Sequence, residues 1–251
     1  MKVQAVVLDL GHTIIDFGPA EEALRTTYAA VLDLLTVEAH ADLPGAEEMI
    51  DGVARRIWSE VTASYERESL DEIDILALFD AALRDLGLTL DPVLVRRIAV
   101  MEHRALAEGE VMPPENLQAL RALKRAGLRL GLVSNIHLLP DMVREDLEKL
   151  HLLDLFDVTV LSSEEGVRKP HPRIYGAVLS RLGLPGEAAV FVGDRLKEDV
   201  RGPKEAGMRA VLTTQFREED PATVAVKPDA VIAALGDLPA LLDAWAREED
   251  T

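Results

Sequence analysis

Short apolar runs rich in β-branched residues alternate with amphipathic stretches along most of the chain. Five of these runs are sharply bounded, as expected for buried strands of a parallel sheet. They cover residues 3–8, 128–133, 158–161, 188–192 and 210–213, and a weaker sixth run covers 229–232. The pattern therefore predicts five or six parallel strands.

Helical spacing fills the intervals between the later runs. In 115–126, Leu117, Leu120 and Leu123 recur at helical spacing and Gly127 follows as a C-terminal cap. The same pattern predicts helices over 141–150, 173–182, 197–206 and 238–247. Gly183 and Gly207 close two of them. Regular alternation of strand and helix from residue 113 onward predicts an α/β fold with a doubly wound parallel sheet.

Residues 18–108 follow a different pattern, with helical spacing throughout and no convincing strand. Helices are predicted over 23–35, 49–61, 73–86 and 94–106, with Pro19, Pro44 and Pro92 in the connections. We predict an all-helical insertion over 18–108, above the carboxyl edge of a core formed by 1–17 and 109–251. An ordinary N-terminal helical domain is the alternative, but the strand at 3–8 would then lack its sheet.

Composition narrows the classes of function. The 251 residues include 27 Lys and Arg against 45 Asp and Glu, a formal charge of 27 − 45 = −18. Such a charge disfavours nucleic-acid and membrane-surface partners. Cysteine is absent, which excludes thiolate chemistry and disulfides. The first apolar run meets Asp9 too early for a signal peptide, and no apolar run reaches 18 residues, so we expect a cytoplasmic protein.

Polar residues follow several predicted strands, where open parallel sheets bind their ligands. Asp9 follows the first strand, Ser134-Asn135 the second, and Asp194 a later one, with Asp199 five residues on. Two carboxylates held together repel each other unless a hard cation such as Mg²⁺ lies between them. An aspartate can also be a nucleophile towards a phosphoryl group, with a lysine and a hydroxyl stabilising the charge that develops.

In this order, the motifs resemble those of the haloacid dehalogenase (HAD) superfamily. The matching segments are Asp9-Leu10-Gly11-His12-Thr13, Ser134-Asn135, Lys169-Pro170 and Gly193-Asp194 with Asp199. The resemblance covers the whole chain. It implies a Rossmann-like core, with 18–108 corresponding to the helical cap of the family's first cap type.

The resemblance also implies a role for each matching residue. Asp9 matches the nucleophile, Ser134 the phosphate-binding hydroxyl and Lys169 the charge-neutralising lysine. The residues that would hold Mg²⁺ are Asp9, Gly11 through its carbonyl, Asp194 and Asp199. The residues expected to lie against the substrate are His12, Thr13 and Asn135.

One position departs from the family pattern. Phosphatases of the family have a general acid two residues after the nucleophile, and here that residue is Gly11. His12 or Asp16 are the candidates to replace it. Family dehalogenases also lack the acid, but they lack the metal-binding aspartate of the last motif as well. Phosphonate hydrolysis uses a cap lysine, and 18–108 contains none. Phosphomutases retain the missing acid.

The predicted function is hydrolysis of a small phosphate ester by a magnesium-dependent phosphatase, through an aspartyl-phosphate. The alternatives are a catalytically impaired relative that binds a phosphoester or regulates a partner and, less favoured, a haloacid dehalogenase. The substrate and the oligomeric state are not predicted. The cap candidates for substrate selection are Tyr28, Arg55, Arg56, Trp58 and Tyr65.

Overall fold

The computed structural model describes residues 2–38 and 42–249 and divides the chain into two compact units. The α/β unit consists of 1–16, 111–136 and 144–251. The helical unit consists of 17–110 and 137–143. No helix among the described residues is both long and apolar enough to cross a membrane.

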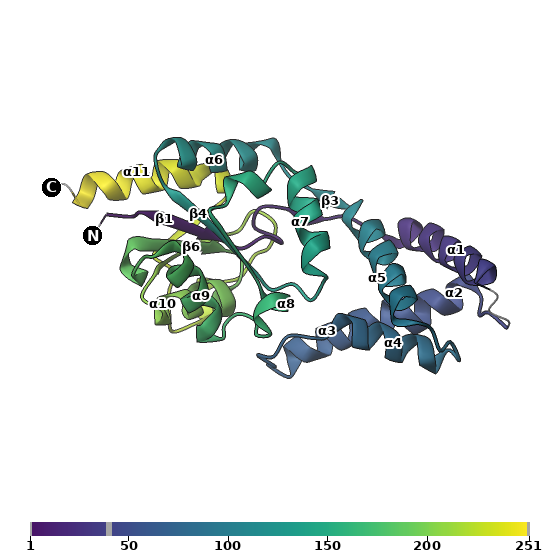
Figure 1. The fold of residues 1–251 in the computed structure, drawn as a ribbon. Helices are drawn as coiled ribbons and strands as arrows, with labels where there is room; N and C mark the ends of the chain where they lie inside the picture. The colour runs from purple at the N-terminus through teal and green to yellow at the C-terminus, as the bar shows by residue number, and fades with distance from the viewer. Residues whose placement is uncertain (1, 39–41, 250–251) are drawn as a thin grey trace. The chain divides into compact units, whose positions relative to one another are not determined.

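A six-stranded parallel sheet organises the α/β unit (Figure 1), and every predicted strand is present in it. The strand order is β5-β4-β1-β6-β7-β8, which places the first strand in the middle. The bounds are β1 Ala5–Leu8, β4 Arg129–Ser134, β5 Val158–Leu161, β6 Ala189–Gly193, β7 Arg209–Thr213 and β8 Ala230–Ile232. This is the doubly wound order, in which the winding direction reverses at the central strands.

Helices cover both faces of this sheet, α6 and α11 on one and α9 and α10 on the other (Figure 1). The helices that follow β3 in the chain have the bounds α6 Pro114–Arg125, α7 Pro140–Lys149, α8 Ser162–Glu165, α9 Pro172–Leu182, α10 Gly202–Glu205 and α11 Leu238–Glu249. Short turns complete the unit: η2 Leu153–Leu155, η3 Gly186–Ala188, η4 Leu196–Arg201, η5 Pro221–Thr223 and η6 Leu235–Asp237. The helix predicted over 197–206 is split between η4, a π-helical turn, and α10.

The sheet is buried on both faces because its strands are uninterrupted apolar runs. Val7 of β1 and Phe191 of β6 pack against Ile174 and Val178 of α9, and all four are fully buried. Long apolar runs without alternation are the sequence counterpart of a sheet covered on both sides.

The helical unit contains α1 and the five helical segments that follow it in the chain, up to α5. Their bounds are α1 Glu21–Val37, α2 Ala46–Met49, η1 Ile50–Arg55, α3 Arg56–Glu66, α4 Ile75–Asp85 and α5 Pro92–Ala107. The pattern predicted as one helix over 49–61 runs through α2, η1 and α3. Asp74 and Asp91 cap α4 and α5 by accepting hydrogen bonds from Ala77 and Val93.

Residues 137–143 belong to the helical unit, although the sequence placed them in the core. Leu139 and Met142 are buried in the apolar core of that unit, together with Val53 and Ile98. The pattern of apolar residues in 137–143 is amphipathic and cannot by itself show which unit covers its apolar face.

The two chain crossings that bound 18–108 lie next to each other. Strands β2 (Asp16–Phe17) and β3 (Glu110–Val111) form a two-stranded sheet that the sequence did not predict. The amide of Gly18 donates to the carbonyl of Gly109 at 2.7 Å. A Cβ on Gly18 would lie 3.0 Å from that same carbonyl oxygen, so the close approach of the two backbones favours glycine.

A polar pair is buried inside the helical unit. The hydroxyl of Tyr28 on α1 donates to Glu102 on α5, and both side chains are buried. Tyr28 therefore belongs to the core of the unit, which corrects its candidacy as a substrate contact. Burial raises the pKa of Glu102 from 4.5 to about 7, and the hydrogen bond from Tyr28 offsets part of that rise.

Glu102→Gln should stabilise the protein at pH 8 and much less at pH 5. The folded chain holds the Glu102 proton up to a pKa of about 7, whereas the unfolded chain loses it near 4.5. Wild-type stability therefore falls as pH rises between these values, by about 3 kcal/mol in total. Glutamine keeps a partner for Tyr28 and has no charge to bury.

Denaturant unfolding of both proteins at the two pH values measures the difference. Glu66→Gln, at an exposed position of α3, is the matched control. An equal effect of Glu102→Gln at both pH values would contradict the burial of an ionising carboxyl group.

Candidate active site at the carboxyl edge of the sheet

The site residues are brought together by the register of the three central strands. Leu8, the last residue of β1, lies beside Leu132 of β4 and Val192 of β6. Asp9, Ser134 and Asp194 follow or end these strands and thus meet at one edge of the sheet. This is the point where the strand order reverses and where ligands of such sheets bind.

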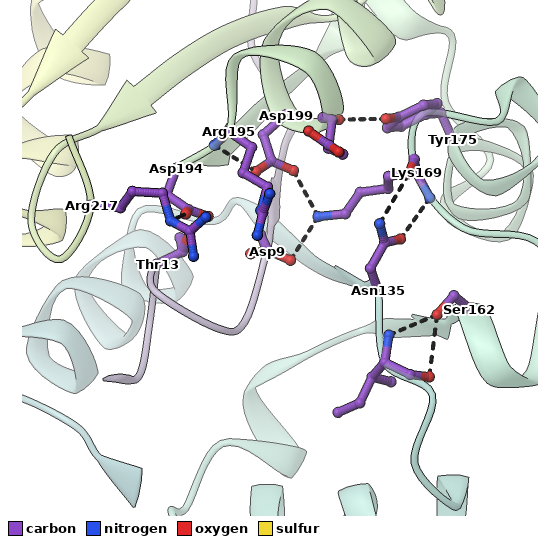
Figure 2. A network of polar contacts seen from close by, with 12 residues as sticks. Asp9, Thr13, Asn135, Ser162, Lys169, Tyr175, Asp194, Arg195, Asp199 and Arg217 are labelled. Atoms are coloured by element: carbon purple, nitrogen blue, oxygen red, sulfur yellow. Dashed lines mark hydrogen bonds and ion pairs between the residues drawn. The ribbon is translucent and has the colours of Figure 1, made fainter. Parts of the chain in front are cut away.

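Lys169 lies between two carboxylates of this edge (Figure 2). Its Nζ is 2.6 Å from Oδ1 of Asp9 and 2.7 Å from Oδ1 of Asp199, and its side chain is 2% exposed. Burial alone lowers the pKa of Lys169, but the charges of Asp199 and Asp9 outweigh it and raise the pKa above its ordinary value. The lysine is therefore a permanent cation that joins the two carboxylates.

Asp194 completes a cluster of three buried carboxylates. Ligand atoms of Asp9, Asp194 and Asp199 all lie within 4.8 Å of one another. Nε of Arg217 lies 2.8 Å from Oδ2 of Asp194, and the Thr13 hydroxyl contacts its Oδ1 at 3.5 Å. Burial, and then the charges of Asp199 and Asp9, raise the pKa of Asp194. Burial also raises the pKa of Asp199, with Lys169 opposing it.

The cluster has the donor set of a hard-cation site. Three carboxylates converge, and Oδ2 of Asp194 is buried without a hydrogen-bond partner among the described residues, since the contact from Arg217 is an ion pair without hydrogen-bond alignment. Carboxylate oxygens are the ligands that Mg²⁺ prefers in proteins. The side chains of Asp9, Asp194 and Asp199 thus fit the predicted ion.

Gly193, the last residue of β6, makes room for Asp199. A Cβ at position 193 would lie 2.3–2.5 Å from the Cγ, Cβ and Oδ2 atoms of Asp199. The backbone amide of Arg195 donates to Oδ2 of Asp199 at 3.0 Å. The turn from β6 into η4 therefore folds Asp199 back over the end of its own strand, towards Lys169.

The side chain of Asn135 fixes the backbone of Lys169 through two hydrogen bonds. Its amide donates to the carbonyl of Lys169 at 3.0 Å, and its Oδ1 accepts from the Lys169 amide at 2.6 Å. Asn135 was predicted as a substrate contact, and in the structure its side chain positions the lysine.

Ser134, the predicted phosphate-binding hydroxyl, is buried at the end of β4. Close to it in the chain, the backbone of Ile136 exchanges two hydrogen bonds with the hydroxyl of Ser162.

The loop after β1 turns back on itself beside Asp9. Gly11 bridges to Ile15, and the His12 amide donates to the carbonyl of Ile15 at 2.7 Å. His12 has a φ of 56°, a left-handed conformation in which histidine is more frequent than most residues. Its Nδ1 lies 2.9 Å from Oδ1 of Asp16. Thr13 is fully buried.

Sequence reasoning missed Arg217 and Asn116. Asn116 donates to the carbonyl of Ile14 at 2.8 Å and accepts from Gln215 at 3.2 Å, so it links the loop after β1 to the loop after β7. Arg217 lies in that second loop. The rule that located Asp9 and Asp194, which inspects residues beyond the carboxyl ends of strands, would also have drawn attention to the residues that follow β7.

A comparison with protein-family models matches residues 3–207 to the haloacid dehalogenase-like hydrolases. The chain belongs to this family. The match spans all four motifs, from the loop after β1 to the turn after β6, which confirms the resemblance and the α/β fold.

Among curated proteins, the hydrolase is 30% identical over 219 residues to a glyceraldehyde 3-phosphate phosphatase of Methanopyrus kandleri, which covers 87% of each chain. It is 28% identical over 244 residues to a phosphoglycolate phosphatase of Salmonella typhimurium, which covers 96% of this chain and 93% of the other. Among solved structures, a 2-haloacid dehalogenase from Pseudomonas syringae superposes with a TM-score of 0.69 over 97% of this chain and 99% of that one, at 24% identity. This last likeness shows the fold.

Gly193→Ala should displace Asp199 and lower the free energy of unfolding of the hydrolase by about 1–3 kcal/mol, the usual cost of forcing a group into a packed site. Gly176→Ala on α9 is the matched control, because no atom lies within 4 Å of its added Cβ and alanine favours the helix.

Thermal unfolding of both variants measures the difference. Equal stability of the two variants would show that Asp199 can move without breaking its contact with Lys169.

Proposed function

We propose that this hydrolase is a magnesium-dependent phosphatase of small phosphorylated metabolites, with Asp9 as its nucleophile. Two relatives that align over most of the chain have phosphatase names. The buried cluster of Asp9, Asp194 and Asp199 supports a metal-dependent reaction. A phosphate monoester is a small dianion, and a site with Lys169 and a divalent cation suits that charge.

The observation that carries the proposal is the pairing of Lys169 with both Asp9 and Asp199, beside Asp194. Dehalogenation was the less favoured alternative because family dehalogenases lack the metal-binding aspartate of the last motif. Here Asp194 and Asp199 are both present, buried and aimed at the same cluster as Asp9. Phosphoryl transfer can use such a cluster to hold a metal ion, whereas halide displacement in this family needs no metal ion.

The proposed reaction has two steps. A carboxylate oxygen of Asp9 attacks phosphorus, the bond from phosphorus to the leaving oxygen breaks, and that oxygen takes a proton. Water then attacks the aspartyl-phosphate, which releases inorganic phosphate and restores the Asp9 carboxylate. Lys169 remains cationic throughout and stabilises charge on the phosphoryl oxygens, with the Ser134 hydroxyl as the expected donor. Magnesium, held by Asp9, Asp194, Asp199 and the carbonyl of Gly11, would neutralise further charge.

The proton donor is the part of the site that differs from the family pattern. Gly11 has no side chain, and the neighbouring His12 is hydrogen-bonded to Asp16. A carboxylate on Nδ1 orients an imidazole and fixes its tautomer, as in other acid–base pairs. We assign proton transfer to His12, with Asp16 as its positioning residue.

The alternative function, an impaired relative that binds a phosphoester, is favoured by Gly11 alone. The expectations that the protein does not bind nucleic acid and that it lies in the cytoplasm stay predictions.

Asp9→Asn should lower turnover of an aryl phosphate by at least about 10³-fold, because an amide is a poor nucleophile and a poor ligand for a hard cation. The measurement is steady-state hydrolysis of p-nitrophenyl phosphate over a range of magnesium concentrations. Asp243→Asn, at an exposed position of α11, is the control. A wild-type protein without turnover at any magnesium concentration would instead favour the impaired relative.

His12→Asn should lower turnover of an alkyl phosphate about 10²-fold and that of an aryl phosphate much less. Nitrophenolate leaves without a proton, whereas an alkoxide needs one. Asparagine also accepts a positive φ, so the variant keeps the backbone of the loop.

The ratio of alkyl to aryl turnover is the measured quantity. A uniform loss on both esters would assign His12 to substrate binding, and an unchanged ratio in Asp16→Asn would separate Asp16 from proton transfer.

A further inference from the structure

The three carboxylates of the site do not share the same cationic partner. Lys169 contacts Asp9 and Asp199, and it forms no ion pair with Asp194 in the part of the chain that the structure describes. The cation against Asp194 is Arg217, with Nε 2.8 Å from Oδ2. Arg217 is also the strongest of the cations that lower the pKa of Asp194, ahead of Lys169. Arg217 thus supplies the main positive charge on one side of the cluster.

Arg217 is held in place by both ends of its loop, which runs from β7 to η5. On one side, Gln215 donates to Asn116 at 3.2 Å and accepts from the amide of Leu235 at 2.9 Å. On the other side, Glu219 accepts from the amide of Leu196 at 2.6 Å. Leu196 is two residues beyond Asp194, so the loop is tied to the same turn that carries the carboxylate.

The contact between Arg217 and Asp194 is suited to exchange. The Asp194 side chain is 2% exposed and that of Arg217 is 28% exposed, so the guanidinium has a path to water that the carboxylate lacks. The contact is made on Oδ2, an oxygen that receives no aligned hydrogen bond among the described residues. A divalent cation in the cluster would compete for the charge of that same carboxylate.

We propose that Arg217 is an exchangeable counter-ion, paired with Asp194 while the cation site is empty and released towards solvent when a divalent cation binds. The inference rests on the proposed metal-dependent function. A guanidinium and a divalent cation that share one oxygen, Oδ2 of Asp194, would repel each other strongly. Binding of a cation at that oxygen must therefore break the ion pair, and the affinity for the cation is reduced by the free energy of that pair. Arg217 is thus a residue that sets metal affinity and stabilises the metal-free site.

Direct binding of MnCl₂, measured by isothermal titration calorimetry without substrate, tests the exchange. Arg217→Gln should bind Mn²⁺ about three- to thirtyfold more tightly than wild type, the range expected for one partly exposed ion pair. Arg217→Lys, which keeps the charge, should fall between them. Arg181→Gln is the control for charge, since Arg181 lies at the C-terminal end of α9 and pairs with Glu165, which is not part of the carboxylate cluster.

Thermal unfolding supplies the second readout. In EDTA, Arg217→Gln should unfold at a lower temperature than wild type, and saturating Mn²⁺ should remove that difference. Weaker or unchanged Mn²⁺ binding in Arg217→Gln would overturn the exchange, because Arg217 would then hold Asp194 ready for the metal. Absence of binding in every variant would overturn both the exchange and the metal site. Binding to wild type without any phosphatase turnover would contradict the proposed function and leave the exchange standing on its own result.

Discussion

Mutual repulsion among three buried carboxylates is the constraint on which the site of this hydrolase depends. Asp9, Asp194 and Asp199 present oxygens within 4.8 Å of one another at the edge of an apolar sheet. Two like charges about 4 Å apart repel by about 4 kcal/mol at the effective dielectric constant of a protein surface. The surrounding structure supplies what offsets this repulsion: Lys169 joins two of the carboxylates, Arg217 contacts the third, and Asn135 holds the backbone of the lysine. These contacts keep a costly cluster of charge in a single arrangement.

The sequence predicted the sheet well because its strands are apolar runs that only a doubly covered sheet can bury. It predicted that Asp9, Asp194, Asp199 and Lys169 belong to one site, because one topological rule places the strand ends together and the motifs resemble those of a known family. The strand-end rule also covers the loop after β7, but it does not show that Arg217 contacts Asp194, because that loop is fixed by hydrogen bonds to Asn116 and Leu196, which are remote in the sequence. For similar reasons, the burial of Tyr28 against Glu102 could not be predicted, since it depends on how α1 packs against α5.

The same sheet serves dehalogenases and phosphatases, so the fold does not decide the chemistry. The decision lies in a few side chains at one edge. Asp194 and Asp199 favour phosphoryl transfer, and Gly11 removes the proton donor that phosphatases of the family place beside the nucleophile. The pairing of His12 with Asp16 on the adjacent turn places a titratable side chain next to that gap. The absence of an acidic side chain at Gly11 is thus accompanied by a contact between the next residue, His12, and Asp16.

The hydrogen bond between Gly18 and Gly109 has a consequence for how such a protein can evolve. Because the helical segment leaves and re-enters the α/β unit through adjacent residues, its ends stay together whatever lies between them. The entropic cost of closing a loop at that point grows only slowly with its length. Helices between the two glycines can therefore be lengthened, replaced or recombined with little effect on the pairing of β1 with β4 and β6. The two glycines form a junction at which new selectivity can be added to an unchanged reaction centre.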